Sequence, residues 1–105
     1  MDNPNVILTP DGCGIILKTI SFVGLLYDSD GHDNPKWDHC YFTIHYGPKP
    51  TEHSFAYYYH EYSDDKKTLF AKAQNIRNEL LKMMNNGIDA KQINAKINLK
   101  KKDDK

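Results

Sequence analysis

The chain has 105 residues with 14 basic and 14 acidic side chains, which fits one small domain and gives no basic excess for nucleic acid or membranes. No apolar run approaches the roughly 20 residues that span a bilayer. The N-terminus also has no basic segment followed by an apolar stretch, the pattern of a secretory signal, so we expect a cytoplasmic protein. Two cysteines, Cys13 and Cys40, are too few for a disulfide framework. We expect both to be reduced, although the sequence leaves one disulfide between them open.

The first part of the chain favours β-strands. Residues 6–9 form a short β-prone run that ends at residues 10–12 (Pro-Asp-Gly), a sequence typical of a tight turn. Residues 13–28 are rich in β-branched and aromatic side chains and exceed the usual length of a strand. They predict either one strand bent near Gly24 or two strands that meet around residues 18–21.

The middle of the chain predicts a β-hairpin. After a polar loop over residues 28–36, side chains alternate over residues 37–46 and again over residues 53–62. The segment between them, residues 47–50, has the sequence Gly-Pro-Lys-Pro and is typical of a turn. We therefore expect two antiparallel strands joined through this turn.

The two faces of this hairpin differ in chemistry. We assume a register with Tyr46 opposite His53, and a slip of two residues would change the partners without mixing the faces. In the assumed register His39 faces His60, and Tyr41 faces Tyr58. One face would carry mainly apolar side chains, namely Cys40, Phe42, Ile44, Phe55, Tyr57 and Tyr59. The other would carry aromatic rings and two histidines.

A sheet packed by one helix needs only one apolar face, so the opposite face is a candidate binding surface. Tyrosine and tryptophan give a large contact area at a small entropy cost and dominate binding hot spots. The candidate binding residues are Trp37, His39, Tyr41, Tyr58, His60 and Tyr62. Two other interpretations stay open: rings that only stabilise the sheet, and N-terminal strands that cover this face.

The hydrophobic period changes from 2 to 3.6 in the last part of the chain. Residues 65–85 place their apolar side chains on one stripe, which predicts an amphipathic helix of about six turns. Ser63 or Asp64 is the expected N-cap, and Gly87 is the expected C-terminal stop.

A second, shorter helix is expected from Asp89, with Ile93 and Ile97 on its apolar edge. The charged residues 100–105 predict a disordered tail after a single domain over residues 1–99. Together these elements predict an α+β fold. It would consist of an antiparallel meander of three to five strands, a long amphipathic helix packed on one sheet face and a short C-terminal helix.

No spacing in the sequence indicates a metal site or a catalytic motif. His39 and His45 are six residues apart in one expected strand, which is roughly 20 Å and too far for one zinc ion. Cys40 points away from His39 because neighbouring side chains of a strand lie on opposite faces, so the two cannot form a thiolate–imidazole pair. We expect no catalytic residue, no metal and no cofactor.

The sequence therefore predicts a small non-catalytic binding protein, such as an adaptor, inhibitor or regulatory accessory protein of bacterial or phage type. Its expected partner is another protein or a second copy of the chain as a homodimer. One alternative is a nucleic-acid-binding module that uses the same aromatic face together with Lys66, Lys67 and the lysines of residues 100–102. Another is a protein or small enzyme that holds a small ligand around His39 and His60.

Overall fold

The computed structural model describes residues 6–29, 33–86 and 90–97, and the fold below refers to these residues. Its elements are β1 (Val6–Leu8), β2 (Gly14–Ile16), the 3-10 helix η1 (Leu17–Thr19), β3 (Phe22–Val23), β4 (Tyr27–Ser29), η2 (Pro35–Trp37), β5 (His39–Tyr46), β6 (Thr51–Tyr58), η3 (Tyr59–Glu61), α1 (Lys66–Asn86) and α2 (Ala90–Ile97). Antiparallel strands followed by a long and a short helix confirm the predicted α+β fold. The expected helix boundaries at Gly87 and Asp89 and the expected tail over residues 100–105 lie outside the described residues.

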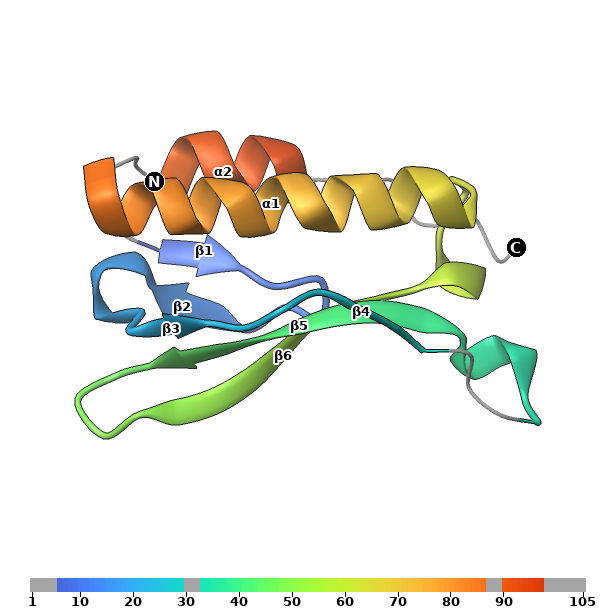
Figure 1. The fold of residues 1–105 in the computed structure, drawn as a ribbon, viewed down its shortest axis with the longest axis horizontal. Coiled ribbons are helices and arrows are strands. Elements are labelled where there is room, and N and C mark those ends of the chain that lie inside the picture. The colour runs from blue at the N-terminus through green and yellow to red at the C-terminus, as the bar shows by residue number, and fades with distance from the viewer. Residues whose placement is uncertain (1–5, 30–32, 87–89, 98–105) are drawn as a thin grey trace.

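The two helices form one layer, and the strands lie below it (Figure 1). α1 runs along the long axis of the molecule, and α2 lies beside it near the two-stranded sheet of β1 and β2. The β5–β6 hairpin forms the side of the strand layer that is farthest from the helices. Within the described part of the chain, neither helix is long and apolar enough to cross a bilayer.

β5 is the central strand of the larger sheet. Along one edge it pairs with β6 over its full length. Along its other edge it pairs with two short strands, β3 near its C-terminal end and β4 near its N-terminal end. All of these pairs are antiparallel. β3 and β4 therefore act as one edge strand with an interruption between them.

That interruption is a β-bulge. Val23 and Tyr27 hold the pairs on either side of it, so three residues, 24–26, face only two residues of β5, 42–43. Strict alternation would place Phe22 and Tyr27 on opposite faces, because they are five residues apart. The extra residue brings both rings to the same face of the sheet, opposite His45 and Tyr41 respectively.

The bulge is held by Arg77 of α1, the only arginine of the chain. Its Nε donates a hydrogen bond of 2.6 Å to the carbonyl oxygen of Gly24, whose own amide donates to the carbonyl oxygen of Thr43 at 2.7 Å. A Cβ on Gly24 would lie 3.3 Å from the Phe22 ring and 3.4 Å from that oxygen. The structure thus combines the two expected alternatives, with a bend at Gly24 and a break at η1 over residues 17–19.

The hairpin register differs by two residues from the assumed one. Tyr46 pairs with Thr51 and not with His53. The reason lies in the turn, because Gly47 has a φ of +88° and begins the reversal directly after β5. The loop of residues 47–50 then closes at Thr51. The slip leaves the two faces unmixed, as expected for a shift of two residues.

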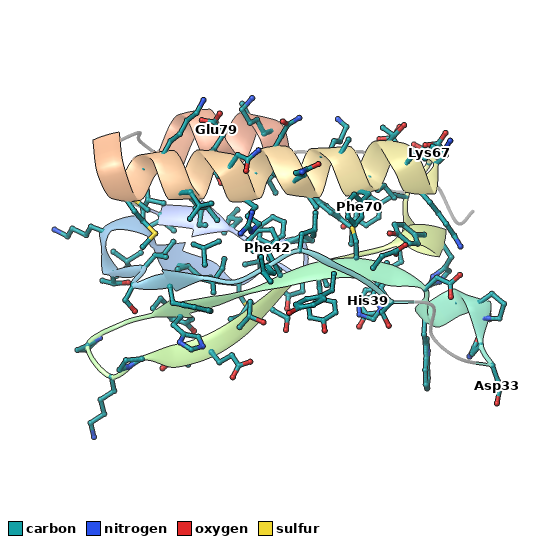
Figure 2. All side chains as sticks on the ribbon, viewed as in Figure 1. Asp33, His39, Phe42, Lys67, Phe70 and Glu79 are labelled. Carbon is teal, nitrogen blue, oxygen red and sulfur yellow. The ribbon has the colours of Figure 1, made fainter. Side chains whose placement is uncertain are left out.

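α1 packs on the apolar face of the sheet, as predicted. Phe42 points from β5 toward the helix layer, whereas His39 lies on the other side of the sheet (Figure 2). Fully buried side chains between the layers come from β5, β6 and α1, namely Phe42, Ile44, Phe55, Tyr57, Leu69, Ala73, Ile76 and Leu80. Each large apolar side chain buried in this way contributes roughly 1.5–3 kcal/mol. Ile93 and Ile97 of α2 are buried too, which confirms the expected apolar edge of that helix.

The N-cap of α1 is Asp65, and the expectation of Ser63 or Asp64 was wrong by one or two residues. Asp65 Oδ1 accepts a hydrogen bond of 2.8 Å from the amide of Thr68, and its carbonyl oxygen accepts from the amide of Leu69. The hydrogen bonds from Thr68 lower the pKa of the Asp65 carboxyl below its ordinary value. Three acceptor side chains in a row made the cap ambiguous in the sequence.

Candidate functional site

Aromatic rings gather on the face of the sheet that α1 does not cover. We call this set the aromatic surface; it comprises Phe22, Tyr27, Trp37, His39, Tyr41, His45 and Tyr58. Trp37 is 62% exposed, Tyr27 52% and Phe22 47%. Large apolar side chains that gather on an exposed face are a mark of interaction sites.

The rings of the aromatic surface touch one another along the strands. His39 stacks on Tyr58 with ring centroids 4.6 Å apart, and Tyr41 lies 5.3 Å from His39 and 5.5 Å from Tyr27. A fifth ring, Phe22, lies 4.7 Å from His45 at the other end of β5. Such cross-strand pairs stabilise a sheet and also hold the rings in fixed positions.

The His39 ring is oriented by the backbone. Its Nδ1 lies 2.7 Å from the carbonyl oxygen of Trp37. Because a carbonyl oxygen can only accept, Nδ1 carries the hydrogen, and the neutral ring keeps Nε2 as an acceptor. His39 is therefore both a stacking platform and a hydrogen-bonding group with a defined tautomer.

An open pocket of about 500 Å³ lies at the end of the aromatic surface where η2 and η3 meet. Its walls come from β4, η2, β5, β6 and η3, namely Ser29, Lys36, Trp37, His39, Tyr58, His60 and Glu61. Two local contacts build it. The Asn34 side chain accepts from the amide of Lys36 at 3.1 Å and so starts η2, and the amide of Tyr59 donates to the carbonyl oxygen of Asp38 at 3.0 Å. These bonds fix the two short helices that carry Trp37 and His60.

Four of the six predicted binding residues line this pocket: Trp37, His39, Tyr58 and His60. Tyr41 lies beside them in contact with the His39 ring. The pairing of His39 with His60 was wrong, because β6 ends at Tyr58 and His39 pairs with Tyr58 instead. The chain then forms η3, which brings His60 back to the same pocket.

The placement of Tyr62 on this face was wrong. The alternation of β6 ends before it, and the ring turns into the core, where it is 4% exposed and packs edge-on against Tyr57 with centroids 5.2 Å apart. The pairing of Tyr41 with Tyr58 was wrong as well, since Tyr41 pairs with Ala56.

Of the lysines expected for a nucleic-acid site, Lys66 and Lys67 do not line the pocket, and those of residues 100–102 lie outside the described residues. Lys66 forms an ion pair with Asp38 at 2.9 Å and lies 5.5 Å from the centre of the Tyr59 ring. Lys67 lies at the start of α1 in the helix layer (Figure 2). Among the described residues, the charged side chains that line the pocket are Lys36 and Glu61.

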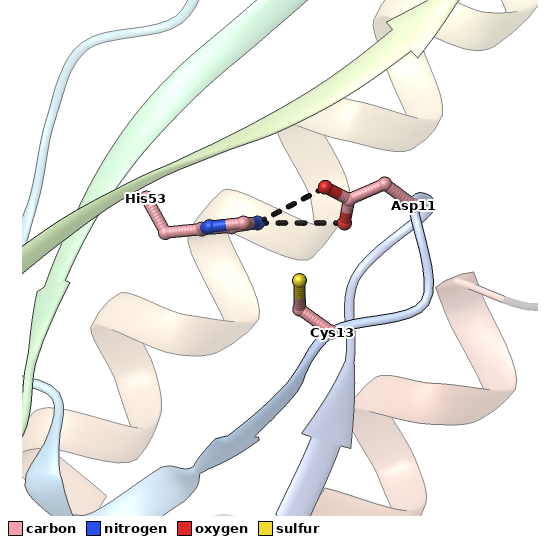
Figure 3. Close-up of side chains that lie close together, drawn as sticks. All are labelled: Asp11, Cys13 and His53. Carbon is pink, nitrogen blue, oxygen red and sulfur yellow. Dashed lines mark hydrogen bonds and ion pairs between the residues drawn. The ribbon is translucent and has the colours of Figure 1, made fainter.

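A second cluster of polar side chains was missed by the sequence analysis. Asp11 and Cys13 come from the turn between β1 and β2, and His53 comes from β6 (Figure 3). His53 Nε2 lies 3.3 Å from Asp11 Oδ2 and 3.4 Å from Oδ1. The carboxylate, the Cys13 sulfur and one imidazole nitrogen all lie within 4.8 Å of one another. We call these three residues the turn cluster.

The turn that carries Asp11 and Cys13 is held by Thr9, which is 3% exposed. The Thr9 hydroxyl donates to Asp11 Oδ1 and accepts from the amide of Cys13 at 3.0 Å. The Thr9 amide donates to the carbonyl oxygen of Cys13 at 2.8 Å. Burial raises the pKa of the Asp11 carboxyl, but hydrogen bonds from Thr9 and His53 and the electrostatic interaction with His53 lower it by more, so that this pKa lies below its ordinary value.

Comparisons with protein-family models, with curated protein sequences and with solved structures found no match for this chain. Both cysteines are free thiols, Cys13 exposed and Cys40 buried.

Proposed function

We propose that this protein is a small non-catalytic binding protein and that its aromatic surface binds a segment of another protein. The observation that carries the proposal is a set of exposed rings, Phe22 and Tyr27 on the sheet face opposite α1 and Trp37 in the adjoining η2. Rings held in place by neighbouring rings lose little entropy on binding. Tryptophan and tyrosine are also the residue types that dominate binding energy at protein interfaces.

The length of the aromatic surface favours a macromolecular partner over a small molecule. The surface follows β5, which has eight residues, from Phe22 beside His45 to Trp37 beyond His39. Eight strand residues span roughly 25 Å. A small ligand would need only the pocket at one end, whereas an extended protein segment can contact the whole length.

The balance of charge favours a protein partner over nucleic acid. Both Lys36 and Glu61 line the pocket, and Glu52 lies opposite His45 at the other end of the hairpin. Nucleic-acid sites neutralise phosphates with an excess of basic side chains. Lys66, the expected phosphate contact, is paired with Asp38.

Site-specific photo-crosslinking tests this proposal. The photoreactive residue p-benzoylphenylalanine would replace Trp37 or Tyr27 on the aromatic surface, and Gln74, an exposed residue of α1, would be replaced as the control. We expect a discrete crosslinked protein from the two surface positions and none from Gln74. With that protein in hand, Trp37→Ala should weaken binding by at least about 30-fold, as for an interface hot spot.

Three results would contradict the proposal. Equal crosslinking from Gln74 would place the contact elsewhere, and a crosslinked species of twice the chain mass would show self-association instead. Nucleic acid in the crosslinked product, with binding that falls steeply with salt, would favour the nucleic-acid alternative.

A small ligand is a second candidate function, because His39 and His60 do line one pocket. Its volume of about 500 Å³ lies within the range of small-molecule sites. Native mass spectrometry of the purified protein would detect a bound ligand as extra mass that is lost on denaturation. The small-ligand function predicts that His39→Ala and His60→Ala both remove this mass, and a bare chain mass in the parent protein would contradict it.

A further inference from the structure

We propose that Asp11, Cys13 and His53 form a binding site for a divalent metal ion of the zinc class. The three residues bring a carboxylate, a thiol and an imidazole together within 4.8 Å. A zinc ion that binds three such donors at its usual bond lengths requires donor atoms roughly 3.3–3.8 Å apart. The distance of 3.3 Å between His53 Nε2 and Asp11 Oδ2 already falls in that range. The inference does not depend on the function proposed for the aromatic surface.

The arrangement fits a metal better than a nucleophilic triad. In such a triad the imidazole uses one nitrogen for the nucleophile and the other for the carboxylate. Here Asp11 lies at Nε2, the nitrogen at the tip of the His53 ring. Figure 3 shows the Cys13 sulfur directed at the space between this tip and the Asp11 carboxylate. The three donors therefore converge on one point, as metal ligands do.

The charges and the protons of the site also balance. Binding would form a metal–sulfur bond and release the Cys13 thiol proton to solvent. It would also replace the hydrogen bond between His53 Nε2 and Asp11, so that the neutral ring would bind through Nε2 with its hydrogen on Nδ1, and Asp11 would bind as the carboxylate. One thiolate and one carboxylate then offset the two positive charges of the ion. A thiolate and an imidazole favour zinc, cobalt or copper over magnesium or calcium, which prefer oxygen donors.

Thr9 gives the site a fixed geometry. Its hydroxyl bonds both the Asp11 carboxylate and the Cys13 amide, so one buried side chain orients two of the three donors. Partners of this kind position metal ligands, and their loss lowers metal affinity by about 10–100-fold. Three protein donors leave a fourth position for water or an external ligand, which is the pattern of open zinc sites. The ion would also join the β1–β2 turn to β6.

Cobalt(II) titration under reducing conditions tests the site, because a cobalt–thiolate bond gives a charge-transfer band in the near ultraviolet. We expect one cobalt ion per chain, displaced by zinc, with a thiolate band that Cys13→Ala abolishes. Cys40→Ala, the matched change at the other cysteine, should keep the band. His53→Gln and Asp11→Asn should each lower the affinity at least about tenfold, and Thr9→Val should lower it by about 10–100-fold while Thr9→Ser retains it.

If cobalt(II) gives no thiolate band with the parent protein, no cobalt–sulfur bond forms and the proposal is overturned. A band that persists in Cys13→Ala, or an affinity unchanged in His53→Gln, would overturn it as well. Far-ultraviolet circular dichroism of each variant without metal checks the fold. Cys13 is exposed, so its replacement should leave that spectrum unchanged.

Discussion

Three tyrosines of the core keep their hydroxyl groups neutral. Tyr57, Tyr59 and Tyr62 are all less than 10% exposed. Removal from water disfavours the phenolate and raises the pKa of each, that of Tyr62 to about 12. The hydrogen bond of 2.7 Å from Tyr59 to Asp28 raises the pKa of Tyr59 further.

We predict a steep loss of stability in alkali from these residues. In the unfolded chain a tyrosine ionises near pH 10, so the stability gained from neutral phenols is complete below about pH 10. It is lost as pH rises from there through the higher folded pKa, by roughly 1.4 kcal/mol per pH unit for each tyrosine. Urea unfolding between about pH 9 and pH 11 measures this slope.

Tyr62→Phe should reduce the slope of the unfolding free energy against pH in alkali by about the contribution of one tyrosine. The same variant at neutral pH is the control, because the phenol is neutral there in both folded and unfolded chains. An alkaline slope that Tyr62→Phe leaves unchanged would show that the Tyr62 phenol ionises equally easily in the folded protein.

At the scale of elements, α1 holds the irregular edge strand through one side chain. The Nε of Arg77 donates to the Gly24 carbonyl oxygen at 2.6 Å. We expect Arg77→Ala to lower the free energy of unfolding by about 1–2 kcal/mol, because a half-buried carbonyl would lose its charged donor. Urea denaturation measures the change.

Lys82→Ala is the matched control on the same helix. The exposed Lys82 pairs with the partly buried Glu79 at 3.8 Å, and such surface pairs contribute less than about 1 kcal/mol. If Arg77→Ala were no more destabilising than Lys82→Ala, the bulge would not depend on the guanidinium.

Local patterns predicted the elements better than the pairings between them. The stripe of Leu69, Ala73, Ile76 and Leu80 follows the helical period, and all four side chains are buried as expected. The hairpin register depended on where the turn closes, and that is decided by the backbone at Gly47. The bulge at Gly24 depends on a bond from a helix far along the chain, so the sequence indicated only a bend.

At the scale of the whole molecule, the two faces of one sheet differ in what they contribute. Phe42 on the covered face is fully buried and stacks on Phe55 with ring centroids 4.9 Å apart. We predict that Phe42→Ala costs about 3–5 kcal/mol of unfolding free energy, whereas Tyr58→Ala costs less than about 1 kcal/mol. Thermal and urea unfolding compare the two variants.

Comparison of the Phe42→Ala and Tyr58→Ala variants also distinguishes the proposed function from a purely structural role for the rings. A large loss of stability in Tyr58→Ala would indicate that the aromatic surface stabilises the sheet. A stable Tyr58→Ala variant that no longer crosslinks would instead agree with a binding surface.

The candidate sites differ in how far the sequence could reveal them. Trp37, His39 and Tyr58 share a face through simple alternation, and the pocket residue His60 joined them only through η3. The turn cluster had no such pattern, because 40 residues separate Cys13 from His53. Only the packing of the β1–β2 turn against β6 brings those donors together.

The bulge also determines which kinds of genetic change this surface can accept. Phe22 and Tyr27 share a face because the bulge absorbs one of the four residues between them, and the exposed Leu25 is one of those four. Replacement of Leu25 keeps the count, so the sheet should accept most side chains there. Deletion of a single codon there would remove the bulge and leave Phe22 and Tyr27 four residues apart, a spacing that strict alternation also places on one face. Sequences that share this surface can therefore vary in composition at this point and can also be one residue shorter, with a regular edge strand in place of the bulge.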